Sequence, residues 1–179
     1  MIKTDKYELY NGDCLEVMDE LIEQGVKIDL TVTSPPYDNL RSYEKSLMWN
    51  FDIFKQVANK LYDITKDGGV VVWIVGDSVK NGGKTLISYE QALYFKSIGF
   101  NVYDVIIYEK TSPSPPHKNR YFNAFEYQFI LSKGKPKTVN LLKDRPNKSA
   151  GTKSGVITKR ESDGSLTKKK SILIGEFGI

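Results

Sequence analysis

The first 134 residues of the chain show two hydrophobic patterns, one typical of helices and one typical of strands. Apolar residues recur at intervals of three and four in segments 14–24, 48–65 and 86–98, which predicts three amphipathic helices. Short apolar runs, or weak alternation, predict five strands; these are segments 6–11, 28–32, 70–75, 102–108 and 125–131. Glycine pairs and Asn-Gly steps mark several of the boundaries.

Strands and helices thus alternate along this region, and two strands follow one another at its end. This order is typical of an α/β fold with a doubly wound, mostly parallel sheet, in which the last two strands form an antiparallel pair. Beyond residue 134 little periodicity remains, except over Ser171–Ile174. We therefore divide the chain into a body, residues 1–134, and a region 135–179 that we expect to be flexible.

The charge of the chain changes at this boundary. The net charge is +4, but residues 1–132 contain 14 Lys and Arg against 18 Asp and Glu, whereas residues 133–170 contain 12 against three. A basic, Gly/Ser/Thr/Lys-rich region after an acidic body predicts a polyanionic partner, nucleic acid being the first candidate. A solvated, disordered tail is the alternative.

Composition narrows the class of protein. A length of 179 residues fits one domain, with or without an appendage, and 40% hydrophobic residues suffice for a core. The sequence has no apolar run of about 18 residues and no secretion signal at its start, so we expect a cytoplasmic protein with no membrane segment. Cys14 and His117 are the only residues of their kinds, which excludes an intramolecular disulfide and predicts no metal site.

Three predicted strands end in polar residues, where ligands bind in open α/β sheets. These ends are Asn11–Asp13, Thr33–Tyr37 and Gly76–Asp77. For Asp77, a cap on the following helix is the favoured interpretation, and a wall of a binding pocket is the alternative.

Ser34-Pro35-Pro36-Tyr37 admits three interpretations: a polyproline surface patch, an ordinary rigid loop, or a catalytic loop. A hydrolase nucleophile at Ser34 is disfavoured, because no Gly-x-Ser-x-Gly surrounds it and His117 is the only histidine that could act as its base.

The motif also has the groups needed to activate an exocyclic amine. The lone pair of such an amine is delocalised into the ring, so two hydrogen-bond acceptors are needed to make the nitrogen pyramidal and nucleophilic. The Ser34 hydroxyl and a backbone carbonyl can be these acceptors, and the prolines fix the carbonyls in place. The Tyr37 ring offers a face on which a flipped base can stack.

In combination, these motifs resemble the S-adenosylmethionine-dependent amino-methyltransferases of DNA, which methylate N4 of cytosine or N6 of adenine. The resemblance covers about residues 7–134 and rests on Asn11–Cys14, Ile28–Tyr37, Asp67–Asp77, Tyr108–Arg120 and Phe125–Gly134. It implies a Rossmann-like sheet, S-adenosylmethionine as cofactor and double-stranded DNA as substrate, with restriction-modification as the setting.

The resemblance also implies roles for individual residues. Ser34, Pro35, Pro36 and Tyr37 would be catalytic, with serine in the first position favouring cytosine over adenine. Asp13 would bind the adenine amine of the cofactor, and the backbone N–H of Cys14 its ring nitrogen. Arg41, Tyr43 and Trp49 could contact DNA, although core packing is favoured for Trp49; His117 is interpreted as a loop residue near phosphate or a bystander.

The glycine-rich cofactor loop of the family is not found in this sequence. The order of motifs matches the permuted arrangement in which that loop comes last, so 1–134 would be a partial catalytic subdomain and 135–179 the start of the target-recognition region. A fragment, an enzyme completed by a second polypeptide, and a degenerate binding relative are the three explanations. We expect the isolated chain to bind S-adenosylmethionine weakly and to be nearly inactive.

Two other classes of function remain open. The body could be a scaffold for a nucleic-acid-binding module that uses the basic region 133–170. Alternatively, Ser112–Pro116 could dock into an SH3-like groove.

Overall fold

The computed structural model describes residues 1–36, 49–111, 118–141, 146–155, 157–169, 171 and 173–175. Contacts within the chain divide it into two compact units, Met1–Thr138 (unit 1) and Val139–Ile179 (unit 2), which we treat separately. Tyr37, Arg41, Tyr43, His117 and the proposed SH3 ligand 112–116 lie outside the described residues.

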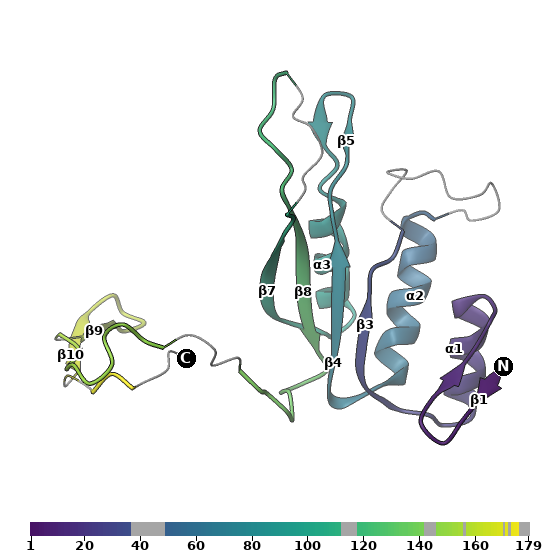
Figure 1. The fold of residues 1–179 in the computed structure, drawn as a ribbon, viewed down its shortest axis with the longest axis horizontal. Coiled ribbons are helices and arrows are strands. Elements are labelled where there is room, and N and C mark those ends of the chain that lie inside the picture. Colours follow the sequence, from purple (N-terminus) through teal and green to yellow (C-terminus); the bar gives the residue numbers. More distant parts are fainter. Residues whose placement is uncertain are drawn as a thin grey trace. The chain divides into compact units, whose positions relative to one another are not determined.

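A four-stranded sheet forms the centre of unit 1, in the order β3 (Ile28–Thr33), β4 (Thr65–Val75), β8 (Phe125–Ser132) and β7 (Asn101–Glu109) (Figure 1). β3 and β4 are parallel, and β8 is antiparallel to both β4 and β7. Three of the four strands therefore run in one direction, and the predicted α/β class and the final antiparallel pair are confirmed.

Three helices accompany the sheet: α1 (Cys14–Glu23), α2 (Phe51–Ile64) and α3 (Ile87–Ser97). α2 begins at Phe51 rather than at the predicted residue 48, because the Asn50 side chain accepts hydrogen bonds from the backbone N–H groups of Asp52 and Ile53. α1 packs against α2, and a salt bridge between Lys60 and Asp19 joins the two helices.

The core lies on one face of the sheet. Buried side chains of β4 and β8 meet those of α2 and α3 there; the cluster contains Phe54, Val57, Ala58, Leu61, Val71, Trp73, Val75, Ala92, Phe95, Phe100, Phe129 and Leu131. The indole N–H of Trp73 donates to the side-chain oxygen of Gln91 at 2.8 Å, so these two buried polar groups are paired with each other.

The structure differs from the sequence prediction at Lys66–Gly69, which we expected to separate a helix from a strand. These residues belong to β4, which starts directly after α2. Ile28 pairs with Thr65 but Leu30 pairs with Val70, so β4 carries three more residues than β3 over this interval and bulges. Backbone hydrogen bonds between Lys133 and this segment, at Gly68 (2.6 Å) and Gly69 (3.1 Å), hold the bulge.

The first predicted strand does not join the central sheet. Within segment 6–11, β2 (Glu8–Leu9) pairs with β1 (Ile2–Lys3) in a separate two-stranded sheet. Between β4 and α3, β5 (Val79–Lys80) and β6 (Gly83–Lys84) form an antiparallel hairpin.

Unit 2 contains regular structure that the sequence pattern did not predict. β9 (Ile157–Arg160) and β10 (Leu166–Lys169) form an antiparallel hairpin, and Lys153 bridges to Leu173. In the described ranges of the chain, no helix has the length and apolar character needed to cross a bilayer.

Candidate active site

A cavity of about 330 Å³ opens beside the carboxyl end of β3. The described part of its lining is uncharged and comes from α1, β3, α2, β4 and the segments next to them: Cys14, Met18, Thr31, Thr33, Ser34, Pro35, Pro36, Trp49, Val57, Leu61 and Trp73. We call it the Ser-Pro-Pro cavity. It brings together two predicted sites, Cys14 and Ser34–Pro36, that are separated in the sequence.

Ser34, Pro35 and Pro36 follow the last residue of β3 directly. Ser34 is exposed, Pro35 is buried and Pro36 is half-buried. Because the proline rings fix their own φ and restrict the residue before them, the backbone carbonyls at this strand end have few alternative directions. The predicted catalytic Tyr37 lies outside the described residues.

Asp13 and Cys14 form the beginning of α1. A side-chain oxygen of Asp13 accepts a hydrogen bond from the N–H of Leu15 at 2.7 Å, so Asp13 caps the helix. Cys14 occupies the first helical position, where the N–H has no acceptor within the helix. Cys14 lines the Ser-Pro-Pro cavity, whereas Asp13 is absent from its described lining. Partial burial, together with the Asp13 charge, raises the pKa of the Cys14 thiol above its ordinary value.

Two further predictions concern Asp77 and Trp49. Asp77 accepts hydrogen bonds from the backbone N–H and the hydroxyl of Ser88, at 3.0 and 2.9 Å, so it caps the first turn of α3 as the favoured interpretation states. Trp49 packs against the core cluster and also lines the Ser-Pro-Pro cavity. The favoured prediction for Trp49, core packing, is therefore confirmed.

A larger cavity, of about 560 Å³, lies past the carboxyl end of β4. We call it the aromatic pocket. It is bounded by the β5–β6 hairpin, the start of α3 and the segment before β8, and is lined by Gly76, Asp77, Val79, Lys84, Leu86, Tyr89, Asn119, Arg120, Tyr121, Phe122, Asn123, Phe125 and Tyr127. Figure 1 shows the hairpin and the segment before β8 rising above the sheet.

The aromatic pocket was not predicted from the sequence, although a pocket wall was the alternative interpretation for Asp77. The clustering of aromatic and basic residues over 118–127 was the available signal. On the pocket floor the hydroxyls of Tyr89 and Tyr127 are hydrogen-bonded at 2.8 Å. This bond, with lesser contributions from burial and from the Tyr89 and Asp77 charges, raises the pKa of Tyr127 to about 12.

Comparison with known sequences places this arrangement in a family. A match to the N6/N4 DNA methylase family covers residues 28–172. The orphan methyltransferase M.BamHII of Bacillus amyloliquefaciens is 53% identical over 154 residues, which is 85% of this chain and 57% of that protein. The type II beta methyltransferase M.BslI of a Bacillus strain is 28% identical over 75% of this chain and 17% of its own length. The chain thus spans little more than half of M.BamHII.

Solved structures show the same fold. The PvuII DNA methyltransferase (cytosine-N4-specific) aligns with a TM-score of 0.58 and 22% identity, over 72% of this chain and 50% of its own. The M1.HpyAVI–SAM complex aligns with a TM-score of 0.53 and 24% identity, over 78% and 58%. The motifs, the Rossmann-like sheet and the match over residues 28–172 agree, and the chain belongs to the N6/N4 DNA methylase family.

Proposed function

We propose that this chain carries the target-base half of an S-adenosylmethionine-dependent DNA methyltransferase that acts on an exocyclic amine, N4 of cytosine being favoured over N6 of adenine. The observation that carries the proposal is the Ser-Pro-Pro cavity, where Ser34–Pro36 at the end of β3 and Cys14 at the start of α1 line one hollow.

Ser34 and the backbone carbonyls beside the prolines are the groups that would act on the amine. By accepting hydrogen bonds from its two N–H groups they would favour a pyramidal nitrogen, whose lone pair is available for attack. Tyr37 would stack on the flipped base, in keeping with its place in the motif. The nitrogen would bond to the methyl carbon as the methyl–sulfur bond breaks with its electron pair left on sulfur, so that S-adenosylhomocysteine is the leaving group, and the methylated amine would then lose a proton to the acceptors or to water.

The cavity fits part of the cofactor. S-Adenosylmethionine supplies an electrophilic methyl group, and the described lining holds no cation that would repel its sulfonium. The backbone N–H of Cys14 would donate a hydrogen bond to a ring nitrogen of the cofactor's adenine. Asp13, at the same helix end, would accept a hydrogen bond from the adenine amine. The described lining contains no glycine-rich loop or acidic residue, so these residues would hold only one side of the cofactor.

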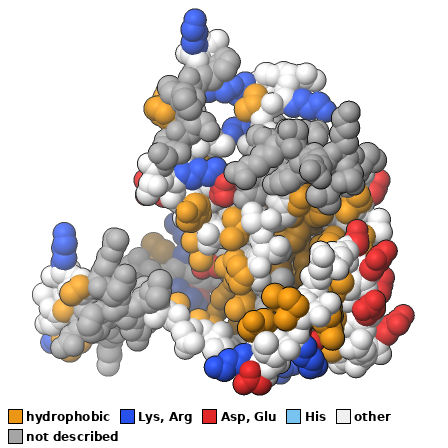
Figure 2. Space-filling model, turned by 45° about the vertical axis from the view of Figure 1, so that its right-hand side comes forward, with side chains coloured by type: hydrophobic (Ala, Val, Ile, Leu, Met, Phe, Trp, Pro, Cys, Tyr) orange, Lys and Arg blue, Asp and Glu red, His pale blue; other side chains and the backbone are white. Residues whose placement is uncertain are grey.

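We also propose that a complementary segment completes the sheet, either from elsewhere in the same protein or from a second polypeptide. β3 is a terminal strand of the described sheet, and Leu30 and Val32 on it are 57% and 62% exposed. Figure 2 shows hydrophobic side chains gathered on one surface of unit 1. Apolar strand edges left open in this way pair readily with another strand.

Residues 135–179, which include the basic unit 2, are the proposed start of the target-recognition region, and double-stranded DNA is the proposed substrate. Lys153, Lys159, Arg160 and Lys168 are mostly exposed there, as expected for contacts to phosphates. The cytoplasm is the compartment that such a substrate implies. A nucleic-acid-binding relative without catalysis is the second candidate, supported by the same charge.

Methyl transfer from labelled S-adenosylmethionine to DNA, with and without a separately supplied cofactor half from M.BamHII, tests the proposal. We expect little transfer by the chain alone, restored transfer with the added half, and loss of transfer in Ser34→Ala and Tyr37→Ala. Nucleoside analysis of the product distinguishes N4-methylcytosine from N6-methyladenine. Persistent lack of transfer together with salt-dependent DNA binding would support the non-catalytic candidate instead.

The docking of the complementary segment has its own test. Val32→Lys places a charge on the open apolar strand, so we expect it to prevent restoration of activity by the added half. Lys66→Ala, a change on β4 at an exposed ion pair with Asp29, is the matched control. The added half should restore methyl transfer to this variant as it does to the unchanged chain. Equal restoration in both variants would show that β3 is not the docking strand.

A further inference from the structure

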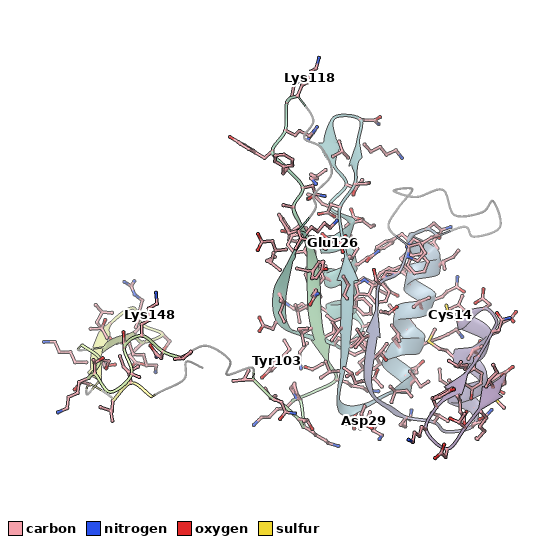
Figure 3. The ribbon with its side chains drawn as sticks, in the orientation of Figure 1. Cys14, Asp29, Tyr103, Lys118, Glu126 and Lys148 are labelled. Atoms are coloured by element: carbon pink, nitrogen blue, oxygen red, sulfur yellow. The ribbon has the colours of Figure 1, made fainter. Side chains whose placement is uncertain are left out.

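We propose that a second copy of this chain pairs with the outer edge of β7, in an antiparallel and two-fold symmetric arrangement that joins the two central sheets. β7 is the terminal strand of the described sheet at the end opposite β3. Figure 3 shows Tyr103 of β7 and Asp29 of β3 on the two sides of this sheet. The inference goes beyond the proposed function, because it involves neither the Ser-Pro-Pro cavity nor the strand proposed to receive the complementary segment.

β7 exposes large apolar side chains on both of its faces. The exposed set is Tyr103, Val105, Ile106, Ile107 and Tyr108. Val105 pairs with the core residue Phe129 of β8, so Val105 and Ile107 project to the helix side of the sheet, and Ile106 projects to the other side. β7 has nine residues, which is long for an edge strand, and long apolar edges are templates for a further strand.

The backbone of β7 presents hydrogen-bonding groups to a further strand at alternate residues. The N–H of Lys110 donates to the carbonyl of Ala124 at 2.7 Å, which continues the ladder between β7 and β8. Because the N–H groups of an antiparallel strand point alternately to its two sides, those of Val105 and Ile107 point away from β8. The Val105 N–H agrees with this direction, since it donates to the carboxylate of Asp104 at 2.8 Å.

The charges of β7 select a two-fold register centred on Ile107. With Ile107 opposite the same residue of the second copy, Ile106 lies opposite Tyr108, and Asp104 lies opposite Lys110. The symmetry repeats each of these pairs. A register displaced by two residues, with Ile106 opposite Ile106, puts Asp104 opposite Tyr108 and loses both charge pairs. The strand is therefore complementary to itself in charge as well as apolar, and this is the reason for proposing a second copy as its partner.

Asp104 would change its partner when the second copy binds. In the single chain its carboxylate accepts the hydrogen bond of the Val105 N–H and so occupies one donor of the edge. In the paired strands this N–H would donate to the carbonyl of Glu109 of the second copy, which releases the carboxylate to Lys110. Lys110 forms an ion pair with Glu126 of β8 at 2.5 Å, so its side chain is held in place before pairing and loses less freedom in the interface.

Disulfide formation between single cysteines tests the register. In a Cys14→Ser background, Ile107→Cys places two cysteines opposite each other at the two-fold axis, where the Cα atoms of a hydrogen-bonded pair are about 5.5 Å apart and a disulfide can form. Val105→Cys is the matched control, because Val105 lies on the same face and is 44% exposed against 52% for Ile107, but its two copies would be about 14 Å apart. We expect oxidation to give a covalent dimer of Ile107→Cys and none of Val105→Cys on a non-reducing gel.

Charge reversal tests the pairing without a cross-link. Sedimentation velocity is measured in the Val32→Lys background, which suppresses association through β3, and there we expect a monomer–dimer equilibrium with no larger species. Asp104→Lys creates two like-charge pairs across the interface and should weaken the dimer about tenfold or more. The double variant Asp104→Lys/Lys110→Asp restores opposite charges and should recover dimerisation. Glu20→Lys, the same charge change at an exposed position of α1, is the control and should leave the dimer unchanged.

Several outcomes would overturn the inference. A Val32→Lys chain that stays monomeric at every concentration would mean that no second copy occupies the β7 edge. Equal cross-linking of Ile107→Cys and Val105→Cys, or none in either, would reject the register centred on Ile107. Circular dichroism confirms the fold of each variant, so that a folded Asp104→Lys chain that dimerises as well as Glu20→Lys would reject the charge pairing.

Discussion

Asp77 illustrates how one carboxylate can connect two elements. It follows the end of β4 closely, and both of its oxygens accept hydrogen bonds from Ser88 in the first turn of α3. Its exposed fraction is 9%, so little water competes for these bonds. A negative charge at a helix N-terminus is also stabilised by the helix dipole. The sequence position alone, one residue past a glycine at a strand end, was sufficient to predict the cap.

The first prediction concerns this cap. Asp77→Ala removes both acceptors and leaves the N–H and hydroxyl of Ser88 buried, so we expect the free energy of unfolding to fall by about 1–3 kcal/mol. Ser88→Ala removes only the hydroxyl bond and should cost less. Urea denaturation followed by circular dichroism measures both. Equal costs in the two variants would show that the backbone bond contributes nothing.

The second prediction concerns the tyrosine pair of the aromatic pocket. The hydrogen bond between the Tyr89 and Tyr127 hydroxyls raises the pKa of Tyr127 to about 12, above its ordinary value of 10. The folded state therefore retains the phenol proton more strongly than the unfolded state does. The resulting stabilisation is fully present below pH 10 and disappears as the pH rises to about 12.

Spectrophotometric titration near 295 nm checks this prediction. The unchanged chain should contain a tyrosine that ionises after the others, and Tyr127→Phe identifies it by removing that last step. Tyr89→Phe deletes the partner hydroxyl and should move the pKa of Tyr127 toward 10. A late step that survives Tyr89→Phe unchanged would mean that burial, and not the hydrogen bond, is its cause.

At the scale of elements, the helices and central strands were predictable because periodicity reports which face is buried. The bulge over residues 66–69 was not predictable in this way. Lys-Asp-Gly-Gly has the composition of a turn that ends a helix, and its place in β4 depends on hydrogen bonds to Lys133, which is distant in the sequence. The hairpin at Asn81-Gly82 could have been predicted. Both residues have positive φ, 50° and 81°, and Asn-Gly is a strong signal for such a turn.

The third prediction concerns the bulge. A Cβ atom at Gly69 would lie 2.9 Å from the carbonyl oxygen of Lys66 and 3.1 Å from that of Asp29, so backbone must move to accept it. We expect Gly69→Ala to lower the free energy of unfolding by about 1–3 kcal/mol. Gly83→Ala is the control, because a Cβ atom there would lie at an ordinary contact distance, 3.9 Å, from the carbonyl oxygen of Lys80. Chemical denaturation of the two variants provides the comparison.

At the scale of the whole molecule, sequence alone indicated the family, and it singled out Ser34–Pro36 and Cys14, which line one cavity in the structure. It did not indicate the aromatic pocket, because Lys84, Tyr89 and Phe125 come together only when the hairpin, α3 and β8 are placed. The hairpin of unit 2 was also missed. Its Asp163-Gly164 turn was available in the sequence, but its strands consist largely of polar residues without a hydrophobic period.

The fourth prediction concerns the open strand β3. With Leu30 and Val32 more than half exposed, we expect the isolated chain to self-associate as its concentration rises. Val32→Lys should reduce this association, and Lys66→Ala should not. Sedimentation velocity across a concentration series measures it. A chain that stays monomeric throughout would indicate that the β3 edge is protected.

Cys14 is the one cysteine of the sequence, and it lines the Ser-Pro-Pro cavity. A thiol-specific fluorophore would therefore attach at a single position, inside the site proposed for the methyl donor. Its rate of attachment becomes a chemical reporter of occupancy: any molecule that fills the cavity should shield the sulfur and slow the labelling. The chain thus carries its own probe for screening which ligands, and which complementary segments, close this site.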